Sequence, residues 1–392
     1  MLRYGSSVAS FRDISQHRLL FQYQLLRRNS SSRFKENDLA LIIQTSRPDK
    51  QWLTKPLKLG LKQGITNGDI SHESIIGIKP RSKLFQTKFK RNKFIVIKPT
   101  LEDYVNLSAR DAQPIYPLDA NAIVNLADLH IDYPKLSEDG TKLAPGEYPI
   151  QILECGTGHG SLTIAISKIL HPANCFIKML GLENGRGAIL HSIDNNLKHL
   201  QTGMKNLQKF ENGIYFQNVE FHNSESPTEW LLNDLKSLKF KKMVDPNILD
   251  EHESSKCFLN AIFLDMPNPH EHFTILSQHL RINAPLIIFC PSVTQILECI
   301  KTLNNDRSIK LSFNKCIEIL PGVGGGLREW DTRFVQIRAT GEQGTVCRPK
   351  VGSRVVGGGF VGIFRKLTEN SKTLEEEEEE VEGEVEGETT LV

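Results

Sequence analysis

The stretch Ile150–Ser161, I-Q-I-L-E-C-G-T-G-H-G-S, decides the fold of this chain. Its apolar run ends at an acidic residue and three alternating glycines. An amphipathic segment follows, and we expect it to stop at Pro172. This order predicts a strand, a tight turn and the start of a helix. The glycines allow positive φ angles and let a ligand approach the main chain without a Cβ in between.

The spacing of the glycines, G-x-G-x-G, indicates which kind of ligand the loop could hold. A dinucleotide-binding loop places its third glycine differently, at the helix start. The shorter loop resembles the one with which class I methyltransferases hold S-adenosylmethionine, a ligand that has no pyrophosphate. By itself the loop leaves a nucleotide-type site and a plain strand-to-helix turn equally open.

Length and composition limit the class of protein. At 392 residues the chain is long enough for two domains and a buried core. Its seven cysteines form no C-x-x-C pair, which favours reduced thiols in a non-secretory compartment. No apolar stretch approaches the roughly 20 residues that span a bilayer, so we expect no membrane partner. The net charge of +2 conceals a basic body, which permits but does not require a polyanionic partner.

The two ends of the chain carry opposite charge. Residues 1–35 hold seven basic side chains against Asp13 alone, are rich in serine, and space their apolar residues as one helical face. This pattern predicts a mitochondrial transit peptide, removed near Arg27–Ser32, and therefore a protein of the mitochondrial matrix, with the nucleus as the alternative. The other interpretation of the segment is a disordered basic arm. Residues 367–392, with Glu375–Glu380 unbroken, predict a disordered acidic tail that is either a solvated end or a self-inhibitory mimic of nucleic acid.

Residues 36–100 are expected to form a small β domain. Short β-type runs alternate with turn residues here, which suggests a small barrel or sandwich. The expected strands are Leu39–Ile43, Leu57–Leu61 and Lys93–Lys98.

Residues 101–366 are expected to form an α/β domain. Strands alternate with helical patterns, which predicts a sheet covered by helices on both faces. The polar stretch 236–256 indicates an inserted loop. The expected strands after the glycine loop are Ala188–Ile193, Leu259–Leu264 and Pro285–Cys290.

Three acidic residues stand at the ends of expected strands, where open α/β sheets bind their ligands. Glu154 precedes the glycine loop, Asp194 ends the second strand, and Asp265 ends the third within L-D-M-P-N-P. Asp194 suits hydrogen bonds from ribose hydroxyls, although it suits the cap of the next helix equally well. The prolines after Asp265 fix the direction of its carboxylate, which favours a reactive group over a structural turn. The H-E-H run at 270–272 lacks a third ligand at a recognisable spacing, so we expect no metal.

Five motifs follow one another along the chain in a recognisable order. They are G-D-I-S-H-E-S-I-I-G at 68–77, K-P-T-L-E-D-Y-V at 98–105, Q-P-I-Y-P-L-D at 113–119, the glycine loop, and L-D-M-P-N-P at 264–269. This order resembles the tRNA (adenine-N1)-methyltransferases that modify the T-loop adenosine, in their catalytic-subunit form. The resemblance runs from about Glu36 to Lys366, and methyltransferases in general lack the second and third motifs.

The resemblance implies a class I (Rossmann-like) S-adenosylmethionine-dependent methyltransferase domain, a small N-terminal β domain that helps to hold tRNA, and S-adenosylmethionine as the cofactor. It also implies a tetramer, either of one chain or with a non-catalytic paralogous subunit, and no metal. It assigns catalytic roles to Asp265 and Tyr116. Carried over by position, the implied cofactor contacts are Gln113, Ile115, Tyr116, Glu154, Gly156, Thr157, Gly158, His159, Gly160, Ser161, Asp194, His222, Asn223 and Asp265.

The reaction that the resemblance implies is methylation of N1 of the T-loop adenosine in tRNA. A buried carboxylate that accepts a hydrogen bond from the exocyclic amine would stabilise the charge that develops on the ring. Two alternatives stay open. Departures from the family pattern at Leu118, His159, Asn223 and His270 would suit a non-catalytic, methyltransferase-like RNA-binding subunit. The fold alone would suit a methyltransferase that acts on a protein or a small molecule.

Overall fold

The structure is a computed structural model that describes residues 33–87, 92–138, 140, 144, 149–181, 186–234, 257–320, 330–338, 340–349 and 358–368. The predicted transit peptide up to residue 32, the insertion at 236–256 and the tail from residue 369 lie outside the described residues. In the part of the chain that is described, no helix is long and apolar enough to cross a membrane. All seven cysteines are free thiols.

The N-terminal domain consists of a sheet and a separate hairpin rather than a closed barrel. Its strands are β1 (Leu41–Gln44), β2 (Arg47–Leu53), β3 (Lys62–Ile65), β4 (Gly68–Ser71), β5 (Leu84–Gln86) and β6 (Lys93–Ile97), and the 3₁₀ turn η1 spans His72–Ser74. An antiparallel sheet has the order β2-β1-β6-β5, while β3 pairs only with β4 among the described strands. The two halves enclose one apolar core.

Two predicted boundaries in this domain are wrong. Leu57–Leu61 is not a strand. Leu57 is fully buried in the core, its N–H donates to Asp38 O at 2.9 Å and its carbonyl oxygen accepts from Asn37 N–H at 2.8 Å, and the chain turns at residues 59 and 60. Phe34, which the prediction places in the transit peptide, is 1% exposed in the same core, and its N–H donates to Ile78 O at 2.9 Å. The folded domain therefore begins before residue 36.

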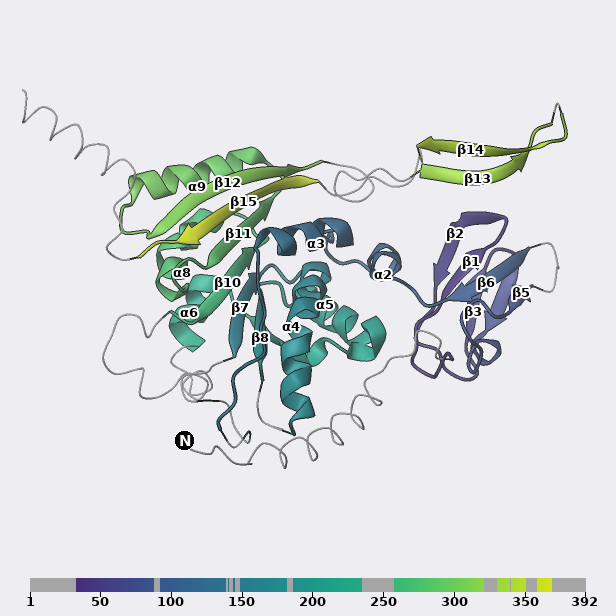
Figure 1. Cartoon of the computed structure of the whole chain (residues 1–392), viewed down its shortest axis with the longest axis horizontal. Helices are drawn as coiled ribbons and strands as arrows, with labels where there is room; N and C mark the ends of the chain where they lie inside the picture. The colour runs from purple at the N-terminus through teal and green to yellow at the C-terminus, as the bar shows by residue number, and fades with distance from the viewer. Residues whose placement is uncertain are drawn as a thin grey trace, which may run out of the picture.

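The second domain is built on a seven-stranded sheet (Figure 1). Its strands are β7 (Ile150–Cys155), β8 (Ala188–Asp194), β9 (Val219–Asn223), β10 (Leu259–Leu264), β11 (Pro285–Cys290), β12 (Leu311–Ile319) and β15 (Gly359–Lys366). The order is β12-β15-β11-β10-β7-β8-β9. β15 pairs antiparallel with both β12 and β11, whereas the pairs from β11 to β9 are all parallel. The predicted bounds of β10 and β11 are confirmed. The carboxyl ends of β7, β8, β9 and β10 meet at one edge.

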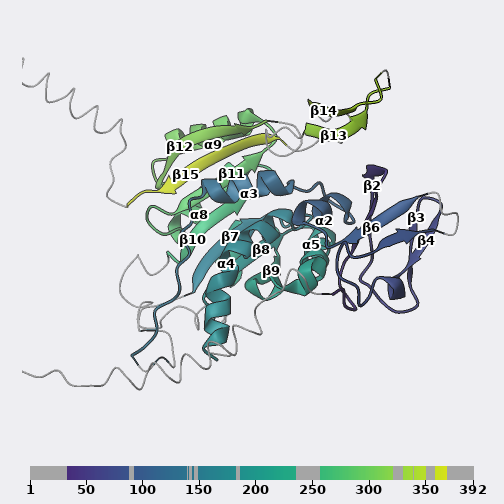
Figure 2. The same cartoon turned by 45° about the vertical axis from the view of Figure 1, so that its right-hand side comes forward.

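Helices cover both faces of this sheet, as the sequence predicts (Figure 2). The α-helices are α2 (Leu101–Leu107), α3 (Pro117–Leu126), α4 (Ser161–Met179), α5 (Leu197–Lys209), α6 (Pro227–Asp234), α8 (Phe273–His279) and α9 (Val293–Asn305), and the 3₁₀ turns are η2 (Phe210–Gly213), η3 (Phe216–Asn218) and η5 (Pro269–His272). Successive strand residues point to opposite faces. Ile152 packs in the core with α3 and α4, whereas Leu153 packs with α6, α8 and α9.

Helix α4 does not stop at Pro172 but continues to Met179. Proline removes one backbone hydrogen bond from a helix, yet buried side chains on both sides of it hold this helix to the sheet, among them Ala173 and Ile177. The buried Asn174 adds four hydrogen bonds. Its Oδ1 accepts from the N–H groups of residues 187 and 188 at 2.8 and 2.9 Å, and its Nδ2 donates to Ala188 O and Asn218 Oδ1, each at 2.9 Å. These bonds fix the start of β8.

The two domains touch through a few contacts, and a hairpin extends beyond the large sheet. Asn212 Nδ2 donates to Asp38 Oδ1 at 2.8 Å across the domain boundary. The strands β13 (Trp330–Gln336) and β14 (Gln343–Pro349) form an antiparallel pair that projects toward the side on which the β domain lies (Figures 1 and 2).

Candidate active site

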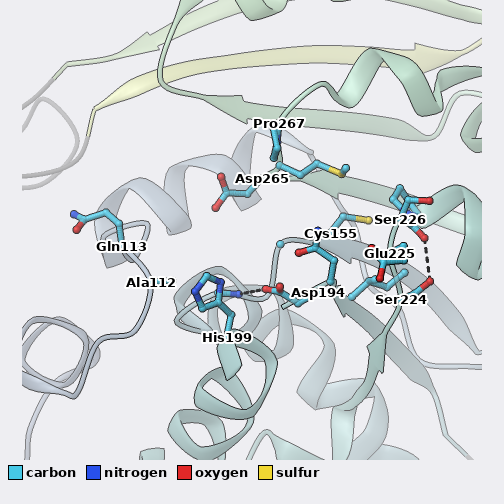
Figure 3. A pocket seen from close by; sticks show the side chains of 16 residues that line it. Ala112, Gln113, Cys155, Asp194, His199, Ser224, Glu225, Ser226, Asp265 and Pro267 are labelled. Carbon is cyan, nitrogen blue, oxygen red and sulfur yellow. Dashed lines mark hydrogen bonds between the residues drawn. The ribbon is translucent and has the colours of Figure 1, made fainter. Parts of the chain in front are cut away.

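A cavity of about 260 Å³ opens at the carboxyl ends of the parallel strands. Its walls come from the segment before α3, the glycine loop, the end of β8 with the start of α5, the turn after β9 and the turn after β10 (Figure 3). The lining residues are Ala112, Gln113, Cys155, Gly156, Gly158, Ile193, Asp194, Asn195, His199, Ser224, Glu225, Ser226, Pro227, Asp265, Met266 and Pro267.

The glycine loop turns sharply from β7 into α4. At Gly156 φ is +97°, and a Cβ there would lie 2.1 Å from the carbonyl oxygen of Asp265. Only glycine therefore lets the loop pass the end of β10, where Asp265 N–H donates to Cys155 O at 2.9 Å. Gly160 begins α4 with φ of +85°, and a Cβ there would lie 3.0 Å from Cα of Gly203 on α5. The loop thus presents its main chain to the cavity.

Asp194 lines the cavity and also holds the glycine loop in place. Its Oδ2 accepts from Gly158 N–H at 2.9 Å, and its Oδ1 accepts from Asn196 N–H at 2.9 Å. Asn196, not Asp194, is the N-cap of α5. Because each carboxylate oxygen has a second lone pair, Asp194 keeps the capacity to accept hydrogen bonds from a ligand.

Asp265 faces the same cavity from the end of β10 (Figure 3). Its side chain is partly accessible through the cavity, but the surrounding protein removes most of its water. This burial, with the negative charge of Asp194 as the second cause, raises the pKa of Asp265 to about 7. Asp265 therefore lines the same cavity as Gly156 and Gly158.

Glu154 does not line the cavity, although the sequence assigns it to the cofactor. It is fully buried beneath the loop, where its carboxyl group accepts from Ser192 Oγ at 2.6 Å and Thr163 Oγ1 at 3.1 Å. Burial is the main cause that raises the pKa of Glu154 to about 8. The buried Thr157 joins this network through a 2.7 Å hydrogen bond to Ser192. Both residues support the loop rather than contact a ligand directly.

The segment before α3 brings Gln113 to the cavity, as predicted. Asp111 fixes this segment against α5 by accepting from Thr202 Oγ1 at 2.6 Å and Lys198 Nζ at 2.8 Å. Tyr116 is buried behind the lining residues, and its hydroxyl lies 3.4 Å from Gln113 Nε2. Tyr116 therefore positions Gln113.

Three more predicted contacts lie next to the cavity without lining it. Ile115 is buried in the apolar core. His159 Nε2 lies 2.9 Å from Ser108 Oγ, and burial, with Arg110 as the second cause, lowers the pKa of His159 to about 4. Ser161 Oγ is buried at the start of α4 with no hydrogen-bond partner among the described residues. At positions 159–161, therefore, the structure brings no side chain into the cavity.

The turn after β9 reaches the cavity two residues later than the sequence prediction has it. His222 points away, to His191 Nδ1 at 3.2 Å and to the Trp230 ring at 5.1 Å. Asn223 Nδ2 donates to Asp194 O at 2.8 Å and so supports the end of β8. The cavity wall is formed instead by residues 224–227. The strand register pairs Asp194 with Asn223, so the residues after 223 are the ones beyond the strand ends.

Sequence reasoning also missed the start of α5 and the residues that flank the predicted acids. Asn195 and His199 line the cavity because they follow Asp194 at the N-terminus of α5, and Cys155, Ile193 and Met266 flank predicted positions. In the run at 270–272, His272 Nδ1 lies 2.9 Å from Thr228 Oγ1.

The lining residues fit an adenosyl ligand of the kind that methyltransferases use. The main chain at Gly156 and Gly158 is open to close approach, Asp194 offers acceptors for ribose hydroxyls, and Ile193, Met266 and Pro227 supply apolar surface for a base.

Comparisons with known proteins agree with the motifs. No family model matches the chain. The tRNA (adenine(58)-N(1))-methyltransferase TrmI of Thermus thermophilus is 24% identical over 267 residues, which are 68% of this chain and 78% of that protein. The crystal structure of the tRNA (m1A58) methyltransferase TrmI from Aquifex aeolicus matches 86% of this chain and 100% of its own, with a TM-score of 0.52 and 20% identity.

A second solved structure, a SAM-dependent O-methyltransferase from Thermotoga maritima, matches 86% of this chain and 96% of its own, with a TM-score of 0.54 and 15% identity. The two solved structures establish the fold, and the sequence relative is named for the family that the motif order resembles. The chain has the class I methyltransferase fold, and its sequence is similar to that of the tRNA (adenine(58)-N(1))-methyltransferase TrmI of Thermus thermophilus.

Proposed function

We propose that this protein methylates tRNA with S-adenosylmethionine as the cofactor, at N1 of the T-loop adenosine. One observation carries the proposal: Asp265 shares a cavity with Gly156, Gly158 and Asp194. The sequence relative is named for this activity, which supports the choice of substrate. S-adenosylmethionine supplies an electrophilic methyl group on a sulfonium centre.

The chain's own residues bind and orient both reactants. The main chain of the glycine loop lies along one wall, and Asp194 accepts hydrogen bonds from ribose hydroxyls. Gln113, held by Tyr116, closes the opposite wall. Alignment of N1 with the methyl group supplies much of the rate by proximity.

Asp265 stabilises the charge that forms on the substrate. A bond forms between N1 and the methyl carbon while the carbon–sulfur bond breaks, so positive charge moves onto the adenine ring. In its ionised form, the Asp265 carboxylate accepts a hydrogen bond from the exocyclic amine and lowers the energy of that cation. The target base must leave its stack to reach the cavity, and basic side chains elsewhere on the body hold the phosphates.

The test is methyl transfer by the full chain. Labelled S-adenosylmethionine and tRNA should give 1-methyladenosine in a nucleoside digest, and Asp265→Ala should slow the transfer by about 100- to 1000-fold while tRNA binding persists. Asp306→Ala, which removes a carboxylate after α9 and outside the cavity lining, is the matched control and should react like wild type.

Each failure of this test has a distinct meaning. Unchanged turnover in Asp265→Ala contradicts the mechanism, and a product other than 1-methyladenosine contradicts the substrate. Cofactor binding without any transfer to tRNA would favour the non-catalytic RNA-binding subunit.

We also propose that the protein acts in mitochondria and as a tetramer. The composition of residues 1–35 supports the location. A fluorescent fusion of the full chain should enter mitochondria, and deletion of residues 1–32, which keeps Phe34, should prevent entry. The exposed apolar side chains of Trp330 and Phe334 on the β13–β14 hairpin support assembly.

A further inference from the structure

A second cluster of polar side chains lies on the opposite side of β8 and β9 from the α4 core. His191 pairs with Glu220 in the β8–β9 register, and His222 follows two residues later on β9, so all three side chains share one face. This face is the one that α6 covers with Trp230. None of the three residues lines the cavity described above.

The potential ligand atoms of these residues converge. His191 Nδ1 lies 3.2 Å from His222 Nε2 and 3.9 Å from Glu220 Oε2, and the three ligand atoms lie within 4.8 Å of one another. Two nitrogens bound to one tetrahedral Zn²⁺ at the usual bond lengths are about 3.3 Å apart. The spacing of the two imidazoles therefore already suits one ion, and Glu220 needs only a small side-chain movement.

Neighbouring groups orient two of the three ligands. His191 Nε2–H donates a hydrogen bond to Gln151 Oε1 at 3.0 Å, which leaves the Nδ1 lone pair directed at the cluster. Arg186 Nη1 donates to Glu220 Oε1 at 2.8 Å and leaves Oε2 for the cluster. In proteins, the histidines and carboxylates that bind metals are usually held by such hydrogen bonds from neighbouring groups.

The surroundings exclude water from one side of the cluster. His191 is fully buried. The Trp230 ring lies 5.1 Å from each imidazole ring. His222 and Glu220 are partly exposed, which leaves a path for an ion.

We propose that His191 Nδ1, His222 Nε2 and Glu220 Oε2 bind one Zn²⁺ ion, with a water molecule as the fourth ligand. Two imidazoles and one carboxylate form a recognised zinc-binding set. Binding moves the proton of His222 to its Nδ1, so the 3.2 Å hydrogen bond is replaced without loss of a proton from the protein. The ion joins β9, the last strand of the described sheet, to β8.

The site has a direct structural consequence for the cavity. Ser224, which lines the cavity, follows His222 by two residues, and Asp194 follows His191 by three. An ion at the cluster would hold together the two strands that deliver these residues. The sequence prediction of no metal considered only the 270–272 run, because ligands on adjacent strands leave no spacing pattern along the chain.

The experiment uses the full chain, freed of any affinity tag and stripped with a chelator, with Zn²⁺ as the probe. Equilibrium dialysis with elemental analysis should find one high-affinity equivalent in wild type. His222→Gln and Glu220→Gln, changes at partly exposed positions, should each weaken this binding by at least about tenfold. His270→Gln changes a histidine outside the cluster and should bind zinc like wild type.

Cobalt substitution separates this site from the free cysteines. Co²⁺ bound by the cluster should give visible d–d bands without thiolate charge-transfer absorption, and the bands should be missing in His222→Gln. The melting temperature of wild type, but not of this variant, should rise with added Zn²⁺. Equal zinc binding by wild type and both cluster variants, or no binding by wild type, would overturn the proposal.

Discussion

At position 265 the carboxyl group stands between its charged and neutral forms near physiological pH. Burial and the neighbouring Asp194 raise the pKa of Asp265 to about 7. The proposed chemistry uses the ionised form, because only a carboxylate stabilises positive charge on the base. A group in this state makes the reaction rate depend on pH.

The rate of methyl transfer should therefore rise with pH across neutrality. Protonation below the pKa removes the acceptor, so kcat/KM should increase about tenfold per pH unit below 7 and level off above about 8. Steady-state assays on one tRNA across this range give the profile. Asp265→Asn should keep a low and flat rate, whereas Asp306→Asn should keep the rise. A flat wild-type profile would contradict the assigned role.

Glu154 predicts a dependence of stability on pH. Its pKa is about 8 in the folded protein, above its ordinary value of 4.5, so the folded state binds the proton more tightly. The stability from this group is complete below about pH 4.5 and is lost as pH rises toward 8.

Glu154→Gln should remove this loss of stability at high pH. At pH 8 the variant should melt several degrees above wild type, and at pH 5 the difference should shrink or reverse. Scanning calorimetry of wild type and variant at pH 5 and pH 8 measures this difference in melting temperature. The same difference at both pH values would mean that Glu154 is ionised in the folded state.

Single residues at strand ends were largely predictable, and side-chain direction was not. Asp194 and Asp265 could be found because apolar runs mark the ends of β8 and β10. Glu154 stands at a similar place, yet its side chain turns to Thr163 under the loop. His222 was misplaced because β9, V-E-F-H-N, has no apolar run that marks its end.

At the scale of elements, the glycine loop connects β7, α4 and β10 through very close contacts. Gly156→Ala would place a Cβ 2.1 Å from a carbonyl oxygen, while Gly158→Ala would meet only Ala112 at 3.7 Å and the backbone at 3.9 Å. Gly156→Ala must therefore displace the loop or the end of β10. Gly158→Ala only has to keep its alanine in the left-handed conformation, at φ of +50°.

Cofactor affinity should separate the two variants. By titration calorimetry, Gly156→Ala should bind S-adenosylmethionine roughly 100-fold or more weakly, and Gly158→Ala about tenfold weakly. Equal losses in both variants would show that the contact with β10 is unimportant for binding.

The sequence predicted the elements whose own residues form a clear apolar pattern. It failed where contacts with distant parts of the chain determine the backbone conformation. The strands β10 and β11 match the prediction residue for residue. Helix α4 continues beyond Pro172 because Asn174 and the buried residues around it bind the sheet. These contacts leave no pattern in the local sequence. In the β domain, Leu57 packs into the core and its backbone bonds to residues 37 and 38, far away in the chain, so its apolar side chain does not mark a strand.

At the scale of the whole molecule, the β13–β14 hairpin exposes apolar side chains. Phe334 is 83% exposed and Trp330 50%, and both stand on a pair of strands that joins neither sheet. Exposed apolar groups gathered on one element are typical of protein–protein contacts. This hairpin is our candidate for the contact between subunits.

Phe334→Ser should therefore weaken assembly. Sedimentation velocity should show wild type as a larger particle than the variant at equal concentration, with the fold intact by circular dichroism. Leu59→Ser, at a 63% exposed position in the β domain, is the matched control and should sediment like wild type. Identical sedimentation of wild type and Phe334→Ser would exclude Phe334 from the contact.

The burial of Phe34 limits where proteolytic maturation can cut this chain. Its ring is 1% exposed among the core residues of the β domain, and its backbone is tied to Ile78. A peptidase that removed the proposed leader through residue 35 would leave a hole in that core. If the proposed leader is removed, the scissile bond must lie upstream of this phenylalanine for the fold to be preserved.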